Sequence, residues 1–198
     1  MPTHAITRRV MTTAIALLAS SAALAADYPE KTITLVVPFS AGGPTDVVAR
    51  ILGQTMAKSL KQSIIVENAL GAGGTLAAGR IARATPDGYT LLLHHNGMAT
   101  STTLYRKLAF NPMTDFEYIG QVADVPMVLM ARKDLAANTL PELIAMIKSK
   151  KDAMTMGHAG LGAVSHQCGM LFLSAIGVPL TTVPYKGTGP AMTDLLGG

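Results

Sequence analysis

The stretch VVPFSAGGPTDVVARIL, residues 36–52, decides the fold, because it passes from an apolar run through a glycine-rich turn into a helical pattern. The run that contains its start, residues 32–37 (TITLVV), is β-branched and largely apolar, which is typical of a strand covered on both faces. After the turn, apolar side chains recur at helical spacing up to about Leu60. The stretch therefore predicts a strand, a tight turn and a helix in direct succession.

The same alternation continues beyond this helix. The sequence predicts a second strand at residues 63–67, a helix from the GAGG at 71–74 to about Ala84, and a third strand that starts with residues 90–93 and ends at His94 and His95. Strands that alternate with helices indicate a parallel sheet with right-handed crossovers.

A second group of elements is expected after a boundary near residues 124–126 (DVP). Strands are predicted at 128–131, 155–158 and 180–183, and helices from a capping box at 139–142 (TLPE) to about Ser149, at 164–176 and at 190–196. We therefore expect two α/β lobes, residues 26–125 and 126–198. The second lobe is short and ends at Gly197 and Gly198, so we expect it to be incomplete.

The N-terminus predicts a secretory signal peptide over residues 1–25. Arg8 and Arg9 precede an apolar run at 10–18, and Ala23-Leu24-Ala25 forms a cleavage site. The apolar run is too short to span a bilayer. The arginine pair leaves both the general secretory and the twin-arginine routes open.

Composition excludes several classes of protein. The net charge is +4, the basic residues are scattered, and tryptophan is absent, so we expect no nucleic-acid partner. The single cysteine, Cys168, cannot form an internal disulfide, and we expect it in the core. The methionines between Met127 and Met170 are also expected to fill core space.

The first glycine-rich turn has two interpretations. Gly42 and Gly43 let the backbone approach a ligand, and the N–H groups of the following helix favour an anion. Alternatively, Thr45 or Asp46 merely caps the helix. A similar turn, HAGLGAVSH at residues 158–166, precedes the helix that begins near Val164. Two such turns facing each other from two lobes would suit a ligand with two carboxylates.

Other motifs carry less chemistry. GAGG lacks the full dinucleotide-binding spacing, so no cofactor is expected. His94 and His95 should point to opposite faces of the third strand and so cannot chelate one metal together, although His95 or Asn96 could donate to a ligand. A packed or solvated imidazole is the alternative. No nucleophile elbow, zinc-protease or paired-cysteine motif occurs, so we expect no catalytic residues, no metal site and no enzyme activity.

The segment YPEKTITLVVPFSAGGPTDVVAR, residues 28–50, resembles the start of the mature substrate-binding proteins of tripartite tricarboxylate transporters, the Bug family. The resemblance spans residues 28–198. It continues through VENALGAGGTLAAGRIARATPDGYTLLL, LYRKLAFNPMTDFEYIG, GLGAVSHQCGMLF and VPYKGTGPAMTDLLGG.

The resemblance implies a periplasmic, two-lobed binding protein of the flytrap type. Such a protein closes on a small carboxylate, a di- or tricarboxylate or a related organic acid, and delivers it as a monomer to the membrane subunits of a tripartite tricarboxylate-type carrier. In the family, the two turns grip the ligand. Carried over to this sequence, the ligand-binding residues are Phe39, Ser40, Gly42, Gly43, Thr45 and Asp46 in the first lobe and Gly162, Ala163, Ser165 and His166 in the second. His95 and Asn96 are added as ligand-binding candidates from their place after the third strand and not from the family.

The sequence departs from the family in two places. Many members carry small and hydroxyl residues where this chain has HHNG at 94–97, and we expect this segment to set which ligand fits. Members also continue past DLLGG, residues 194–198, so the chain resembles a C-terminally truncated member. An exported carboxylate-sensing module for a membrane receptor, or a non-functional truncated fragment, are the alternatives.

Overall fold

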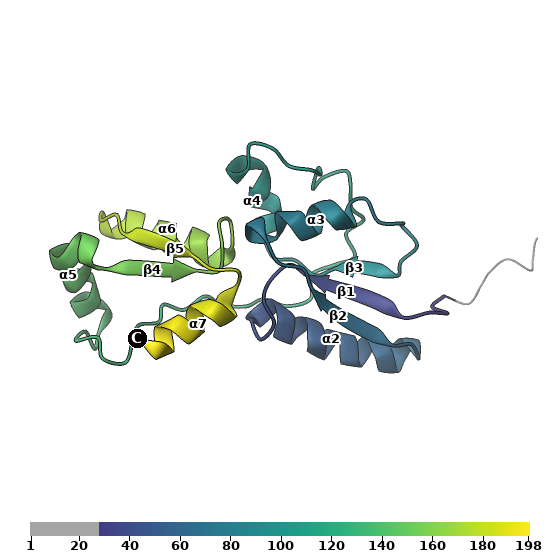
Figure 1. Cartoon of the computed structure of the whole chain (residues 1–198), viewed down its shortest axis with the longest axis horizontal. Coiled ribbons are helices and arrows are strands. Elements are labelled where there is room, and N and C mark those ends of the chain that lie inside the picture. The colour runs from purple at the N-terminus through teal and green to yellow at the C-terminus, as the bar shows by residue number, and fades with distance from the viewer. Residues whose placement is uncertain (1–27) are drawn as a thin grey trace, which may run out of the picture. The chain divides into compact units, whose positions relative to one another are not determined.

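The first lobe is built on a three-stranded parallel sheet. The structure, a computed structural model, describes residues 28–198. Strand β1 (Ile33–Val37) lies between β2 (Ile64–Asn68) and β3 (Thr90–Leu92) and pairs in parallel with both, which gives the order β2-β1-β3 (Figure 1). The central strand is buried along most of its length, as its apolar run predicts. The predicted signal peptide, residues 1–25, lies outside the described residues.

Helices cover both faces of this sheet. Helix α2 (Pro44–Leu60) lies on one face, whereas α3 (Thr75–Ile81) and α4 (Gly97–Leu104) lie on the other (Figure 1). A short 3-10 turn, η2 (Ala72–Gly74), leads from β2 into α3. The core against α2 contains Leu35, Val37, Phe39 and Ala49, and the opposite core contains Ala78, Met98 and Phe110.

The second lobe is built on two parallel strands, β4 (Thr155–His158) and β5 (Thr181–Pro184). A 3-10 turn, η3 (Lys151–Ala153), leads into β4. The helices of this lobe are α5 (Leu140–Lys150), α6 (Val164–Ile176) and α7 (Thr188–Gly197). The predicted fold class, α/β with parallel sheets flanked by helices, is therefore confirmed.

Helix α5 begins at the predicted capping box. The Glu142 N–H donates to the Thr139 hydroxyl at 3.4 Å, and Pro141 stands in the first turn. The Glu142 carboxylate accepts from the N–H of Asn138 at 2.7 Å, one residue before the position that a capping box uses. The start of this helix is thus encoded by its own sequence.

The strand predicted at residues 128–131 is wrong. Residues 116–132 contain no helix or strand, and Val128 and Met130 are 73% and 56% exposed. Within residues 28–198 no strand pairs with this stretch, so β propensity alone does not make it a strand. The lobe boundary near residues 124–126 stays a prediction, since residues 32–198 group as one compact unit.

Two side-chain predictions for the second lobe are also wrong. Cys168, expected in the core, is exposed on α6. Met127 and Met170, expected to fill core space, are 44% and 50% exposed, and Leu171 on α6 is 72% exposed. An apolar side chain on a helix is buried only where another element packs on that face of the helix. No element among the described residues packs on the face of α6 that carries these exposed side chains.

Candidate functional site

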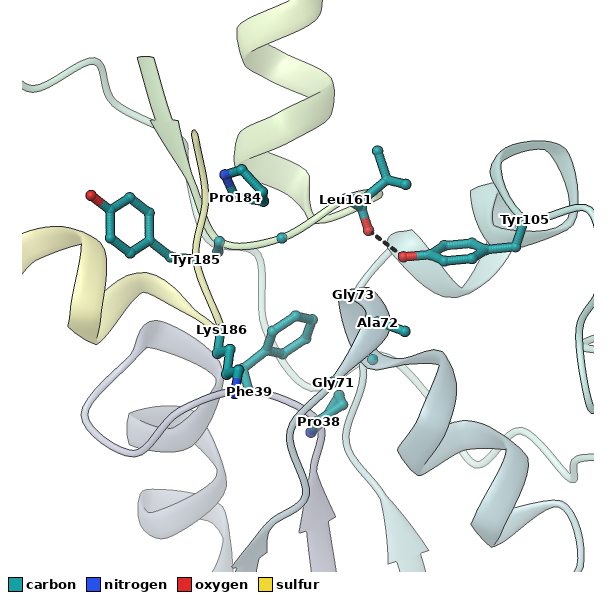
Figure 2. A pocket seen from close by; sticks show the side chains of 13 residues that line it. Pro38, Phe39, Gly71, Ala72, Gly73, Tyr105, Leu161, Pro184, Tyr185 and Lys186 are labelled. Atoms are coloured by element: carbon teal, nitrogen blue, oxygen red, sulfur yellow. Dashed lines mark hydrogen bonds between the residues drawn. The ribbon is translucent and has the colours of Figure 1, made fainter. Parts of the chain in front are cut away.

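A cavity of about 240 Å³ lies among loops from both lobes (Figure 2). Its wall is formed by residues 38–39, 71–74, 159–161 and 184–186, which lie at or just beyond the ends of β1, β2, β4 and β5, and by Tyr105 after α4. Because the carboxyl edge of parallel strands is where open α/β sheets hold ligands, this cavity is the candidate site.

Ser40 supplies an unpaired polar group beside this cavity. It follows the cavity residue Phe39, is only 9% exposed, and its Oγ has no hydrogen-bond partner among the described residues. Buried hydroxyls are nearly always paired, because an unpaired one costs free energy. A β-carbon on Gly187 would stand 2.7 Å from the Ser40 amide nitrogen, and one on Gly189 would stand 3.3 Å from Oγ. The hydroxyl is therefore enclosed by Gly187 and the first turn of α7.

Two helix N-termini meet at Ser40. Helix α2 begins after Gly43 and α7 begins after Gly187, and neither helix has a side-chain cap. A β-carbon on Gly43 would stand 3.9 Å from the Cβ of Thr188, so the two first turns are neighbours. Free N–H groups and the positive end of the helix dipole favour an anion. We call Ser40 together with the first turns of α2 and α7 the anion site.

Asp46 fixes the conformation of the first glycine-rich loop through hydrogen bonds of its carboxylate. Its carboxylate is 2% exposed and accepts from the Gly42 N–H at 2.9 Å, from Arg50 at 2.9 and 3.0 Å, and from the Asn68 amide at 2.9 Å. Burial opposes ionisation of Asp46, but these hydrogen bonds outweigh it and keep the pKa of the carboxyl below its ordinary value. Its oxygens are thus occupied by the protein, which places Asp46 in a positioning role. Thr45 lies half-buried in the first turn of α2 and makes no side-chain cap.

The second predicted turn is fixed by its own side chains. The Ala159 N–H donates to the Ser165 hydroxyl at 2.9 Å, and the Gly162 N–H donates to Nδ1 of His166 at 3.4 Å. Nδ1 of His158 accepts in the same way from the Gly160 N–H at 3.3 Å, and burial is the main cause that lowers the pKa of His158. Ala163 is buried against the core of the first lobe. Ser165 and His166 therefore shape the loop whose residues line the cavity.

The histidines after β3 do not point to opposite faces, contrary to the prediction. The strand ends at Leu92, and the rings of His94 and His95 lie 5.0 Å apart. The His95 ring stacks on Phe39 with centroids 4.5 Å apart. Burial is the main cause that lowers the pKa of both histidines to about 4, so both are neutral at pH 7. Asn96 is exposed at the start of α4, and neither it nor His95 lines the cavity.

Two side-chain hydrogen bonds tie the lobes together at the cavity. The Tyr105 hydroxyl donates to the Leu161 carbonyl at 2.8 Å (Figure 2). The Gln167 amide donates to the Thr100 hydroxyl and to the Gly162 carbonyl, both at 2.8 Å. These contacts were not predicted, because the composition of α4 gives little helical periodicity and this helix was not expected.

The structure brings together only part of the predicted site. Phe39 lines the cavity and Ser40 adjoins it, whereas Gly42 and Gly43 form the turn at the anion site. The lining residues that were not predicted to bind the ligand are Pro38, 71–74, Tyr105, 159–161 and 184–186. The GAGG at 71–74 was predicted as a glycine-rich turn and was considered only as a cofactor motif. Its place in the cavity wall was therefore not predicted.

The sequence matches the family model of the tripartite tricarboxylate transporter family receptor, TctC, over residues 48–198. The chain belongs to this family. The resemblance stated from the sequence is therefore confirmed. The family is one of receptors, and the expectation that the chain is not an enzyme agrees with it.

Relatives of this chain are longer than the chain itself. A UPF0065 protein encoded in the TAR-I ttuE-ttuC' intergenic region of Agrobacterium vitis is 51% identical over 171 residues, which are 86% of this chain and 49% of the relative. The chain thus spans about half the length of this relative.

Solved structures share the fold. The periplasmic binding protein BugD is 50% identical with a TM-score of 0.84, over 86% of this chain and 57% of BugD. MatC of Rhodopseudomonas palustris, solved with bound malate, is 44% identical with a TM-score of 0.80, over 85% of this chain and 57% of MatC. Another protein of that organism, solved with adipate, is 32% identical with a TM-score of 0.75, over 85% of this chain and 57% of its own. These likenesses confirm the fold of a periplasmic binding protein.

Within residues 28–198, no group of three or more histidine, cysteine, aspartate or glutamate side chains is placed to hold a metal ion. The helices of this part of the chain are too short or too polar to cross a membrane.

Proposed function

We propose that this protein is a periplasmic receptor that binds a small carboxylate, a di- or tricarboxylate or a related organic acid, between its two lobes. The cavity receives the ligand, and the anion site holds one carboxylate group. The receptor then delivers the ligand to the membrane subunits of a tripartite tricarboxylate-type carrier. It acts as a monomer and uses no cofactor, metal or catalytic residue.

The observation that carries this proposal is the buried hydroxyl of Ser40 between the first turns of α2 and α7, which has no hydrogen-bond partner among residues 28–198. A carboxylate oxygen there would accept from the hydroxyl and from helix N–H groups, and both are favourable to an anion. Neutral donors suffice for this, as in other sites built on helix N-termini.

The remaining predicted residues divide by role in this proposal. Phe39, Ser40, Gly42 and Gly43 contact the ligand or admit it closely, and Gly162 and Ala163 bring the second loop against the first. Asp46, Ser165 and His166 position these loops, because their side chains are already occupied by backbone N–H groups. His95 acts from behind Phe39 through its stacked ring, whereas Asn96 lies exposed at the start of α4 and keeps no contact role in this proposal.

Export and transport are proposed from the family and from the N-terminus. The family is named for a transporter receptor, BugD is a periplasmic binding protein, and MatC was solved with bound malate. The arginine pair, apolar run and Ala-Leu-Ala of residues 1–25 support export through a cleavable signal peptide.

Thermal unfolding of the purified protein against di- and tricarboxylates, aromatic acids and amino acids tests the proposal. A ligand at 100 times its Kd adds about 2.7 kcal/mol of stability, which raises the Tm of a domain this size by roughly 5 to 11 °C. We expect one or more carboxylates to do so. A cooperative transition that no carboxylate moves would refute the proposal.

A further inference from the structure

Lys186 is the only charged residue in the cavity wall formed by the described residues. It follows β5 and lies beside Phe39 at the edge of the cavity (Figure 2). The rest of the wall consists of glycines, alanine, prolines, aromatic residues and leucine, and it includes no carboxylate. A cavity with one cationic group and no anionic group favours a ligand of negative charge.

The neighbours of Lys186 fix its backbone at this edge. The Tyr185 N–H donates to the His158 carbonyl at 2.8 Å, which extends the pairing of β5 with β4 by one residue. The Tyr185 ring lies against Gly157, and its hydroxyl donates to Asp194 at 2.8 Å. On the other side, Gly187 lies against Ser40. Lys186 is therefore held between a side chain anchored away from the cavity and a glycine at the anion site.

No carboxylate among the described residues neutralises Lys186. Among residues 28–198, it makes no ion pair and no side-chain hydrogen bond. Asp194 accepts from Tyr185, and Asp46 is occupied by Arg50, Asn68 and a backbone N–H. The ammonium group is thus available to a ligand in the cavity.

The site consequently offers two different features to anionic groups. The anion site uses neutral donors, Ser40 and the first turns of two helices, whereas Lys186 supplies a full positive charge one residue before Gly187. We infer that Lys186 is the specificity-determining residue that makes this receptor select dicarboxylates over monocarboxylates. The inference rests on the proposed carboxylate binding and adds to it the residue that distinguishes ligands by their charge.

Calorimetric titration of a matched ligand pair tests this inference. L-malate and 3-hydroxybutyrate differ in that a methyl group replaces one carboxylate. In Lys186→Gln, we expect the Kd for L-malate to rise about tenfold, as for loss of a charge-assisted hydrogen bond, and the Kd for 3-hydroxybutyrate to change less than about threefold. Lys186→Arg should keep malate affinity within about threefold, since its charge is retained.

Lys148→Gln is the control for net charge, because Lys148 lies in the last turn of α5 outside the cavity wall. It should leave both affinities unchanged. Equal weakening of both ligands in Lys186→Gln, or no change in malate affinity, would overturn the inference while leaving carboxylate binding intact. A wild-type protein that binds no carboxylate would overturn the proposed function, and the inference with it.

Discussion

Gly187 lies directly against Ser40: a β-carbon on Gly187 would stand 2.7 Å from the Ser40 amide nitrogen. Gly187 also has a φ of +127°, where L side chains are strained. This contact joins the loop before α7 to the loop before α2, and so it brings two helix N-termini to one hydroxyl. Residues from separate lobes thereby surround the anion site that we propose.

We predict that Gly187→Ala destabilises the protein by about 1 to 3 kcal/mol, through strain at this φ and displacement of the Ser40 loop. Urea unfolding measures the change. Gly177→Ala is the matched control: its φ is +70°, but a β-carbon there would meet nothing within 4 Å. The contact with Ser40 would be without consequence if both variants lost equal stability.

Asp46→Asn should destabilise the protein by about 1 to 3 kcal/mol, because it weakens a buried hydrogen-bonding hub. The native pKa of Asp46 is depressed, so its stabilising contribution is present above the ordinary carboxyl pKa and is lost as the pH falls through the native pKa. The gap between wild type and variant should therefore narrow below about pH 4. Unfolding curves at several pH values test this.

Asp134→Asn serves as the comparison for Asp46→Asn, because it removes an exposed partner of Arg132. We expect little change in stability from it. If the Asp46 variant were as stable as this control at pH 7, the loop would not depend on the Asp46 network.

Much of the fold follows from the sequence alone. Strand β4 and helix α6 have the predicted bounds: a glycine turn follows β4, and Gly162 and Gly177 mark the two ends of α6. The strand predicted at residues 128–131 does not form, because a strand needs a partner strand and a local sequence pattern does not reveal one. The predicted burial of Cys168 was wrong for a related reason: an apolar helix face is buried only where another element packs on it.

The site was less predictable than the fold. Ser40 and the two glycines after it were identified from a local turn whose geometry the sequence encodes. Tyr105, Leu161 and Lys186 were missed, because they meet only after two sheets fold and their loops come together. Neither the spacing nor the residue type of Lys186 distinguishes it from an ordinary surface lysine.

Tyr105→Phe should weaken ligand binding as well as stability. It removes the hydroxyl that donates to the Leu161 carbonyl across the cavity, worth about 0.5 to 1.5 kcal/mol. Tyr118→Phe removes a similar bond to the Pro112 carbonyl within a local loop and should leave ligand affinity unchanged. Calorimetric titration measures the malate affinity of both variants. If Tyr105→Phe bound malate as tightly as Tyr118→Phe, the Tyr105 hydrogen bond would not support the bound state.

The two histidines after β3 predict a pH dependence of stability. Their native pKa values of about 4 lie below the ordinary value of 6.5, so the unfolded chain binds protons first as the pH falls. Stability should therefore decrease from pH 6.5 toward pH 4. His95→Gln should lose less stability than wild type over this window in denaturant titrations, and parallel pH curves would contradict the prediction.

Titration of malate into wild type and Ser40→Ala tests the central claim most directly. Because the Ser40 hydroxyl has no hydrogen-bond partner among residues 28–198, its removal should leave stability unchanged or slightly higher while the Kd rises about tenfold. Ser101→Ala, which removes a buried hydroxyl that donates to the Met98 carbonyl, should show the reverse: lower stability and unchanged affinity. Full malate affinity in Ser40→Ala would contradict a carboxylate site at Ser40.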